Sequence, residues 1–303
     1  MKDHPQEWFF DTLPQECLLR GEELAKYTTI KCGGPAWALM EVRDADEAAQ
    51  ALEGAKLNNI PTLIIGNGSN LLIDDEGFDG LVLHFGAQYA QVTHEGDRIS
   101  AQAGASLMNL SRLAADLELS GLEFAAGIPA SVGGAALMNA GAYGGEMSRV
   151  VHSVDCLDSR GEPITLSNEE IQYGYRHSRM MQDGYTVLTV HLELAPADRE
   201  GIIARMQENN AQRRLKQPLT YPSAGSFFKR PEGHFAGALI EQAGLKGATV
   251  GGAQVSQLHA GFLINIGDAR ARDFRQLVAK VQGTVEDMFG VQLEPEVRMI
   301  FKG

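Results

Sequence analysis

A dense run of glycines is the first feature of the sequence whose residue types could do chemistry. Residues 123–146 hold six glycines, one proline and no lysine or arginine. Glycines at this density permit turns with positive φ and let backbone amides approach a bulky ligand closely. Successive N–H groups in such turns form concave nests that bind anions, phosphates above all. The stretch therefore favours a phosphate-bearing ligand, and a pair of ordinary glycine turns around a short helix is the alternative.

Another glycine loop, GNGSN at 66–70, is the first of the two in chain order and follows a strand predicted at 62–65. It does not fit the Rossmann pattern, because Leu71 stands where the third glycine belongs and no long helix is predicted after it. Walker A spacing, GxxxxGK[ST], occurs nowhere in the sequence. If the loop holds phosphates, it does so in a non-Rossmann manner, and a tight turn is as good an interpretation of these residues alone.

Positive charge gathers in one segment of an otherwise acidic chain. The whole protein has a formal net charge of −13, whereas residues 201–230 carry six basic side chains and one acid, Glu208, for a net charge of +5. The basic residues are Arg205, Arg213, Arg214, Lys216, Lys229 and Arg230. A solvated helix face explains part of this excess, and a site for an anionic ligand is the competing interpretation.

Length and composition exclude several classes of protein. A chain of 303 residues suggests about two domains, and its acidity argues against non-specific nucleic-acid binding. No apolar run approaches the roughly 18 residues of a membrane span, so we expect no membrane insertion. The N-terminus lacks the basic and apolar regions of a secretory signal. Three widely spaced cysteines, Cys17, Cys32 and Cys156, form no CxxC pair. We therefore expect a cytoplasmic protein without a metal site.

Alternating and helical hydrophobic patterns predict the elements that would position these loops. The first 26 residues form an acidic lead-in to which we assign no chemistry. Strands are predicted at 37–42, 62–65, 81–85, 89–95, 98–104, 150–158, 163–167, 185–194, 261–266 and 296–301. Helices are predicted from Asp44 to about 58, after Ser106, and at 198–215, 236–243 and 274–288. A composition shift near 198 divides the chain into 1–27, 28–197 (in two subdomains split near 87) and 198–303.

Taken in chain order, a set of longer motifs resembles the UDP-N-acetylenolpyruvoylglucosamine reductase family, the MurB flavoenzymes. The resemblance runs from about residue 28 to the C-terminus. Its motifs are TTIKCGGPA, IGNGSNLLI, GIPASVGGA, MNAGAYGGE, YGYRHS, KQPLTYPSAGSFFKRPEGHFAGALIEQAGLKG, GGAQVSQLHAGFLIN and LEPEVRMI. It implies an α+β protein with an FAD-binding fold of the vanillyl-alcohol-oxidase (PCMH) type in two subdomains. A C-terminal α+β substrate-binding domain would follow.

The resemblance also implies an activity. With noncovalent FAD and with NADPH as hydride donor, the family reduces UDP-N-acetylglucosamine enolpyruvate to UDP-N-acetylmuramate for peptidoglycan synthesis. Hydride adds to C3 of the enolpyruvyl group, and the charge left at C2 spreads into the carboxylate. Such chemistry needs a fixed cation and then a proton donor at C2.

By position in the family motifs, three residues take these catalytic roles. Arg176 is the cation, because a guanidinium forks onto a carboxylate and stays protonated. Glu296 accompanies it, either by hydrogen-bonding the developing enol or by orienting Arg176, and Ser226 is the proton donor to C2. Each has a plainer interpretation: a surface arginine, a strand-end partner of Arg298, and a turn hydroxyl.

Binding residues follow from the same motifs. The expected cofactor contacts are Gly66, Asn67, Gly68, Ser69, Asn70, Gly127, Ile128, Pro129, Ser131, Gly134, Asn139 and Gly141. The expected substrate contacts are Tyr175, Arg214, Lys216 and Lys229. Two departures from the family pattern stand out. Ala130 replaces a usual glycine, and the stretch before Ser226 is too short for the tyrosine-bearing substrate loop of one branch.

Two rival functions stay open on the sequence. One is another oxidase or dehydrogenase on the same FAD fold, which would leave YPSAGSFFKRP and PEVR unexplained. The other is a UDP-sugar-binding module without catalysis, which a colourless purified protein would support, since bound flavin is yellow.

Overall fold

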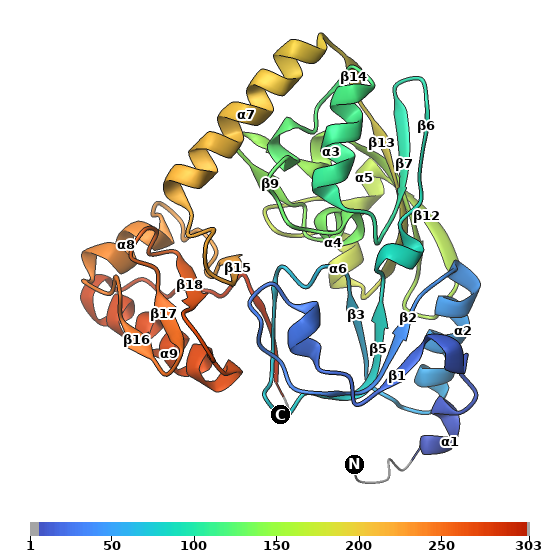
Figure 1. Cartoon of the computed structure of the whole chain (residues 1–303), viewed down its shortest axis with the longest axis horizontal. Coiled ribbons are helices and arrows are strands. Elements are labelled where there is room, and N and C mark those ends of the chain that lie inside the picture. Colours follow the sequence, from blue (N-terminus) through green and yellow to red (C-terminus); the bar gives the residue numbers. More distant parts are fainter. Residues whose placement is uncertain (1–5, 302–303) are drawn as a thin grey trace. The chain divides into compact units, whose positions relative to one another are not determined.

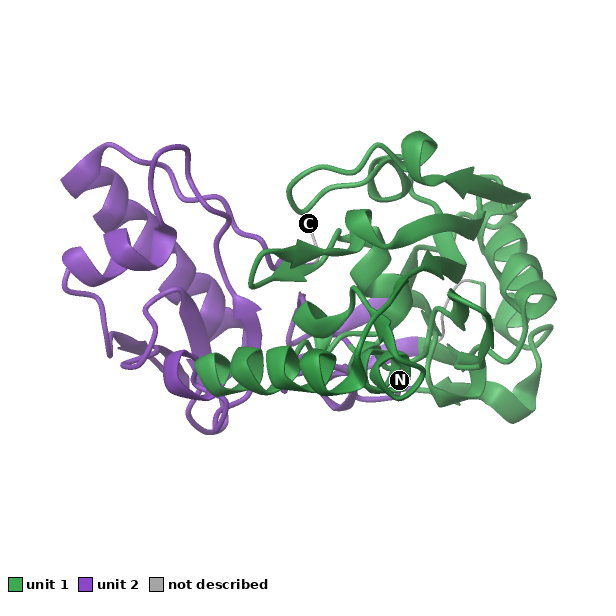
Figure 2. Cartoon of the chain, turned by 90° about the horizontal axis from the view of Figure 1, so that it is seen from above, with its two compact units in different colours: residues 1–20, 38–67, 80–213 green, residues 21–37, 68–79, 214–303 purple. Residues whose placement is uncertain are grey.

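Residues 6–301 are described by a computed structural model, and the chain falls into two units (Figure 2). Unit 1, green, takes the chain up to Arg20, Ala38–Asn67 and Gly80–Arg213. Unit 2, purple, takes Gly21–Trp37, Gly68–Asp79 and the chain from Arg214 onward. The units are thus interleaved in sequence, and the first glycine loop leaves unit 1 at its second residue. The linear division at 27 and 197 stays a prediction.

The first sheet of unit 1 has the strand order β1-β2-β5-β3. Its strands are β1 (Leu18–Arg20), β2 (Ala36–Glu41), β5 (Phe78–His84) and β3 (Thr62–Ile65). Helix α2 (Ala45–Leu57) begins as predicted after Asp44, whose carboxylate accepts a hydrogen bond from the Glu47 amide at 2.8 Å. Strand β3 then runs parallel to β5 and ends at the first glycine loop.

The segment before residue 27 contributes more structure than the predicted lead-in. Strand β1 pairs antiparallel with β2, with Leu19 opposite Leu39. Phe9 and Phe10, in α1 (Glu7–Phe10), are both buried. A three-residue strand is too short to show an alternating pattern, so its pairing was not visible in the sequence.

The second sheet of unit 1 is antiparallel, in the order β12-β11-β13-β7-β6, and Figure 1 shows β13, β7 and β6 side by side. Its strands are β6 (Val92–Glu95), β7 (Arg98–Gln102), β11 (Val151–Leu157), β12 (Pro163–Ser167) and β13 (Thr186–Glu193). Helix α4 (Val132–Leu137) packs against β13 and β7. This packing fixes the second glycine loop on the sheet, because the loop leads directly into α4.

Short elements complete unit 1. The helices are α3 (Leu107–Asp116), α5 (Asn168–Ile171), α6 (Arg179–Gln182) and α7 (Arg199–Lys216), of which α7 ends in unit 2. The strand pairs are β8 (Leu119–Ser120) with β14 (Ala195–Pro196), and β9 (Gly141–Ala142) with β10 (Gly145–Glu146). The 3₁₀ turns are η1 (Gln15–Cys17), η3 (Ala87–Tyr89), η4 (Glu123–Ala125) and η5 (Met147–Arg149).

Unit 2 is built on a sheet in the order β15-β18-β17-β16 and on helix α9 (Ala271–Phe289), which packs on β16 and β17. The strands are β15 (Ser223–Ser226), β16 (Thr249–Val250), β17 (Ala253–Val255) and β18 (Phe262–Asn265). Helix α8 (Ala236–Gln242) packs on α9. The 3₁₀ turn η2 (Leu24–Tyr27) also belongs to unit 2. Strand β4 (Leu71–Ile73) pairs in parallel with β19 (Arg298–Ile300). Phe227, Phe274 and Leu277 lie in the core.

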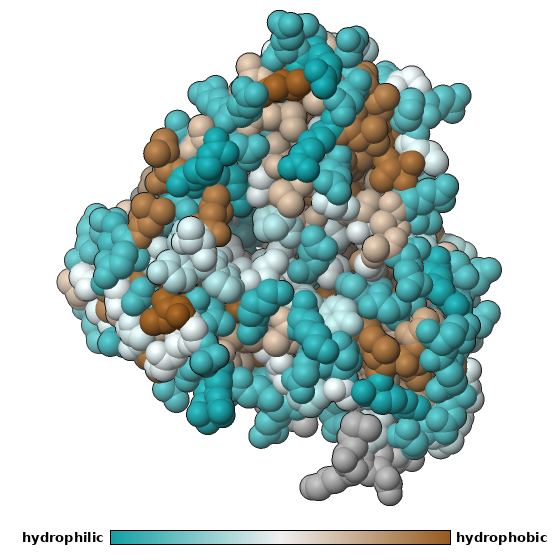
Figure 3. Space-filling view, in the orientation of Figure 1, coloured by the Kyte–Doolittle hydropathy of each residue, from teal (hydrophilic) through white to brown (hydrophobic). Residues whose placement is uncertain are grey.

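The predicted α+β class is confirmed by this mixture of helices and mainly antiparallel sheets. Within residues 6–301, no helix has the length and apolar character needed to cross a membrane. On the face drawn in Figure 3, hydrophobic residues form separate groups among hydrophilic ones.

Candidate active site

The two glycine loops meet in unit 1. A Cβ on Gly66 would lie 2.0 Å from the Ser131 hydroxyl oxygen, so only glycine fits there. The Asn67 side chain donates a hydrogen bond to the Pro129 carbonyl at 3.4 Å. Four predicted cofactor residues, two from each loop, therefore lie together although they are distant in sequence.

The second loop is held by hydrogen bonds on both of its sides. Ser131 caps α4, and its hydroxyl accepts from the Gly134 amide at 3.3 Å. The Leu107 amide donates to the Ala130 carbonyl at 3.0 Å. Ala130 is buried and does not have a positive φ. An alanine is therefore accommodated where the family pattern has glycine.

Arg213 is a site residue that the sequence did not single out. Its side chain lies over the second loop: a Cβ on Gly127 would lie 2.5 Å from its Cδ. Burial lowers the pKa of Arg213, while Tyr143 acts in the opposite direction. In the described part of the chain, no carboxylate forms an ion pair with it. A half-buried guanidinium beside backbone amides is well suited to bind an anion.

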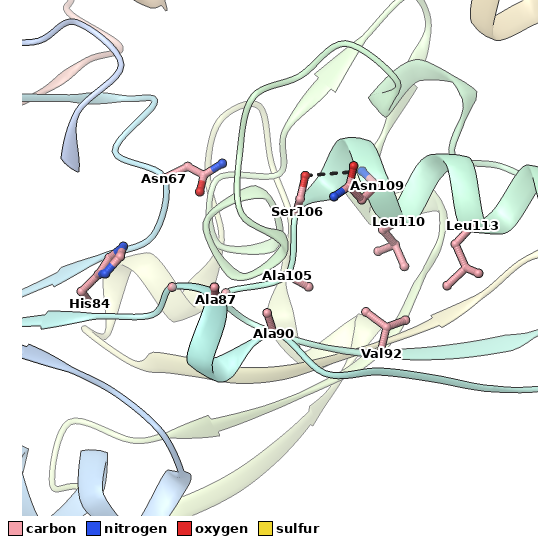
Figure 4. A pocket seen from close by; sticks show the side chains of 12 residues that line it. Asn67, His84, Ala87, Ala90, Val92, Ala105, Ser106, Asn109, Leu110 and Leu113 are labelled. Atoms are coloured by element: carbon pink, nitrogen blue, oxygen red, sulfur yellow. Dashed lines mark hydrogen bonds between the residues drawn. The ribbon is translucent and has the colours of Figure 1, made fainter. Parts of the chain in front are cut away.

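A pocket of about 560 Å³ adjoins these loops in unit 1 (Figure 4). Asn67 of the first loop and His84 lie on one side of it, and Leu110 and Leu113 of α3 lie on the other. The remaining lining residues are Gly86, Ala87, Ala90, Val92, Gly104, Ala105, Ser106 and Asn109. Apolar walls with a few polar groups at this volume are typical of a small-molecule site.

Arg176 is held in a tight turn of unit 1 at the far end of α4. Its φ is +51°, and Gly174 and His177 pair across the turn. The guanidinium donates to the carbonyls of Asn139 at 3.3 Å and Gly141 at 3.1 Å. The guanidinium carbon also lies 5.1 Å from the centroid of the exposed Tyr175 ring. Two backbone carbonyls thus fix the position of the Arg176 guanidinium.

Asn139 supports this turn. Its amide nitrogen donates to the Gly174 carbonyl at 3.0 Å, and its amide oxygen accepts from the Ser148 amide at 2.9 Å. The residue is 1% exposed. Its assignment as a cofactor contact stays a prediction, and its observed contacts are those of a residue that positions Arg176.

Ser226 and Glu296 are neighbours in unit 2. The Glu296 amide donates to the Phe227 carbonyl at 2.8 Å, and the Lys229 amide donates to the Glu294 carbonyl at 2.8 Å. Residues 226–229 and 294–297 therefore run side by side. The exposed end of β15 places Ser226 beside this pairing. Two of the three predicted catalytic residues are brought together, and the third, Arg176, belongs to unit 1.

The C-terminal half of the first glycine loop, residues 68–70, belongs to unit 2 and lies beside Glu296. The Asn70 side chain donates to the Glu296 carbonyl at 3.1 Å, and the Arg298 amide donates to the Asn70 carbonyl at 3.0 Å. The Thr29 amide donates to the Gly68 carbonyl at 3.3 Å. Predicted cofactor and catalytic residues are therefore adjacent in this unit as well.

The basic segment is partly neutralised by ion pairs. Arg205 lies 2.7 Å from a carboxylate oxygen of Glu123, and Lys229 forms an ion pair with Glu294. Arg214 and Lys216, two of the predicted substrate contacts, are exposed at the end of α7. The net charge of residues 201–230 therefore overstates the positive charge that is available to a ligand.

Known protein families match both the N-terminal and the C-terminal part of the chain. Residues 36–167 match the family described as FAD binding domain, and residues 217–300 match the UDP-N-acetylenolpyruvoylglucosamine reductase C-terminal domain. Wild-type Phl p 4.0202, a glucose dehydrogenase, shares the fold over 64% of this chain and 44% of its own, with a TM-score of 0.50 and 14% identity. These features define an FAD-binding oxidoreductase with a vanillyl-alcohol-oxidase type fold.

The family is equally clear. The chain is 50% identical over 281 residues to the UDP-N-acetylenolpyruvoylglucosamine reductase of Latilactobacillus sakei, covering 93% of this chain and 92% of the relative. The Clostridium tetani protein of the same name is 46% identical over 96% of this chain and 94% of its own. The crystal structure of the MurB reductase from Thermus caldophilus matches with a TM-score of 0.80, 38% identity, and 92% and 97% coverage. The chain belongs to the UDP-N-acetylenolpyruvoylglucosamine reductase family.

Proposed function

We propose that this protein reduces UDP-N-acetylglucosamine enolpyruvate to UDP-N-acetylmuramate with NADPH as reductant, in the cytoplasmic synthesis of peptidoglycan precursors. Similarity to reductases of that name over nearly the whole chain supports the proposal. The observation that carries it is the backbone pairing that sets Ser226 beside Glu296. Incubation with NADPH and the enolpyruvyl substrate should yield a product heavier by two hydrogens, detected by mass spectrometry. Oxidation of NADPH without that product would refute the proposed substrate.

The residues of unit 1 fit the diphosphate of FAD. Gly66 and Asn67 meet Pro129 and Ser131, and the Arg213 guanidinium lies over Gly127 without a carboxylate partner in the described chain. Ile128, Gly134 and Gly141 lie in or just after the second loop, and Gly68, Ser69 and Asn70, which belong to unit 2, stay predicted contacts. We assign the diphosphate to the loop residues of unit 1, with Arg213 as its cation. When bound, FAD takes hydride from NADPH and supplies it to the substrate.

The chain's own residues hold the substrate and manage its charge and proton. Arg176, fixed by two carbonyls, binds the substrate carboxylate, where negative charge accumulates during reduction. Ser226 gives its hydroxyl proton to C2, and Glu296 hydrogen-bonds the same region of the substrate. Tyr175, Arg214, Lys216 and Lys229 are the proposed contacts to the UDP portion.

We expect FAD to be held without a covalent bond. Neither glycine loop contains a cysteine or histidine. Cys17, Cys32 and Cys156 are buried, and burial raises the thiol pKa of Cys32 and Cys156 to about 12, which suppresses the reactive thiolate. Acid precipitation should release all the yellow colour into the supernatant. Colour that stays in the pellet would show a covalent link.

Reversing the charge at Lys229 should weaken substrate binding. Because hydrogen bonds to charged groups contribute about 1.5–3 kcal/mol, Lys229→Glu should raise KM for the UDP substrate by roughly 10- to 100-fold. Flavin reduction by NADPH should change little. Glu294→Gln is the matched control, since it removes the ion-pair partner and leaves the cation. A Lys229→Glu variant with the wild-type KM would remove Lys229 from the substrate site.

A further inference from the structure

A serine, a histidine and an aspartate form a chain of hydrogen bonds across three adjacent strands of the antiparallel sheet in unit 1. Oγ of Ser100 on β7 lies 2.8 Å from Nδ1 of His191 on β13. Nε2 of the same imidazole lies 2.8 Å from Oδ2 of Asp155 on β11. None of the three belongs to the glycine loops, lines the pocket or is a predicted catalytic residue. The proposed reductase reaction therefore leaves this group without a role.

The group lies on the face of the sheet that is turned away from the core. Side chains alternate between the two faces along a strand. The neighbours of the three residues along their strands are all buried: Ile99, Ala101, Val190, Leu192, Val154 and Cys156. By contrast, Ser100 is partly exposed, and the side chains of His191 and Asp155 are 32% and 40% exposed. A reagent in solution can therefore reach the group.

The carboxylate fixes the direction of each hydrogen bond. A carboxylate only accepts, so Nε2 of His191 carries its proton toward Asp155. In the neutral ring, Nδ1 is then an acceptor, and the Ser100 hydroxyl donates to it. The Thr165 hydroxyl donates to the other oxygen of Asp155 at 2.7 Å, which holds the carboxylate in place. Ser100 is thus bonded to a base that a third group orients, the arrangement that activates a serine nucleophile.

The sheet limits the acyl donors that such a serine could use. Strand β7 pairs with β13 on one side and with β6 on the other, so the backbone amides around Ser100 are engaged in the ladders. They do not form an oxyanion hole, in which one donor contributes about 10²- to 10³-fold in rate. A good leaving group has to compensate for that loss. The expected donors are therefore activated esters, such as aryl esters and thioesters, and not amides or alkyl esters.

We propose that Ser100 accepts an acyl group from an activated ester, with His191 as its base and Asp155 as the residue that positions the base. Oγ of Ser100 forms a bond to the carbonyl carbon, and the bond from that carbon to the leaving group breaks. The hydroxyl proton passes to Nδ1 of His191 and from there to the leaving aryloxide or thiolate. No oxidant or reductant takes part. This inference goes beyond the proposed reductase function and does not depend on it.

The test is acetylation of the purified full-length protein by p-nitrophenyl acetate, with the acetyl group located by mass spectrometry of peptides. Wild-type protein should carry an acetyl ester on Ser100 that hydroxylamine removes. His191→Ala should slow acetylation of Ser100 by about 10²- to 10⁴-fold, the contribution of a general base. Asp155→Asn should also slow it, because an amide no longer fixes the tautomer of the imidazole. Reduction of flavin by NADPH should be unchanged in both variants.

Ser153→Ala is the matched control for this experiment. Ser153 lies opposite His191 on β11, and within residues 6–301 its hydroxyl forms no hydrogen bond with the imidazole. This variant should acetylate Ser100 at the wild-type rate, and Ser153 itself should stay free in wild-type protein. Wild-type protein with an unmodified Ser100 would overturn the inference. Acetylation of Ser100 at the wild-type rate in His191→Ala would overturn it as well. Thermal melting checks the fold of each variant, and the wild-type result is decisive even where a variant does not fold.

Discussion

Ser226→Ala should slow reoxidation of the reduced flavin by the enolpyruvyl substrate by about 10²- to 10⁴-fold, the usual range for a lost general acid. Reduction by NADPH should proceed at close to the wild-type rate, because the proton is needed only after hydride has reached the substrate. Stopped-flow absorbance of the flavin measures both steps in one preparation. Ser226 lies at the exposed end of β15, so alanine should be tolerated by the fold.

Ser223→Ala is the matched control for this experiment. Ser223 begins the same strand, and its carbonyl oxygen, which the substitution retains, accepts a hydrogen bond from the Thr29 hydroxyl at 2.7 Å. The control should reoxidise at the wild-type rate. Near-normal reoxidation of Ser226→Ala would assign the proton to another residue, and equal slowing of both steps would point to displaced flavin.

Arg176→Lys should produce the second large effect. Lysine keeps the positive charge but loses the fork that reaches the Asn139 and Gly141 carbonyls, so the cation is no longer fixed where charge develops. Removing one preorganised electrostatic contact costs about 10²- to 10³-fold in rate. We expect that loss in reoxidation by substrate, again measured by stopped flow, with FAD content unchanged.

Arg179→Lys is the control for Arg176. Arg179 lies three positions on, and its Nε is 3.0 Å from the Asp183 carboxylate, away from the Asn139 and Gly141 carbonyls. It should reoxidise normally. If the two lysine variants reoxidise at the same rate, Arg176 is a surface arginine, the plainer interpretation of the sequence.

Local signals in the sequence predicted the elements well. The strands at 62–65 and 163–167 have the predicted bounds. Asp44 and Ser106 cap helices, as predicted, where a polar residue precedes an apolar pattern. Each of these features depends on residues that are close together in the sequence, so a single sequence is enough to predict it.

Features that depend on distant pairing were not predicted. The contact of Gly66 with Ser131, the pairing of β1 with β2, and the Glu41–His84 pair each join segments well separated along the chain. Arg213 was visible only as one of six basic residues. Arg213 differs from the others because it is half-buried over Gly127 and, within residues 6–301, forms no ion pair, and only the fold shows this.

The catalytic residues were predicted by resemblance rather than by pattern. Nothing in the spacing of Ser226 and Glu296 indicates that their segments lie side by side, and the structure shows it through the hydrogen bond from the Glu296 amide to the Phe227 carbonyl. For Asn139, resemblance suggested a cofactor contact, whereas the fold supplies it with partners in the Arg176 turn. The family motifs suggested a set of site residues, and the contacts in the structure show which groups each of them is hydrogen-bonded to.

In the proposed reaction, the protein accepts hydride from NADPH on FAD and passes it to the enolpyruvyl substrate. Anaerobic addition of one equivalent of NADPH to the purified holoenzyme should bleach the visible flavin absorbance. One equivalent of UDP-N-acetylglucosamine enolpyruvate should then restore it and yield one equivalent of UDP-N-acetylmuramate. Flavin that NADPH does not bleach, or that stays bleached after the substrate is added, would contradict the account.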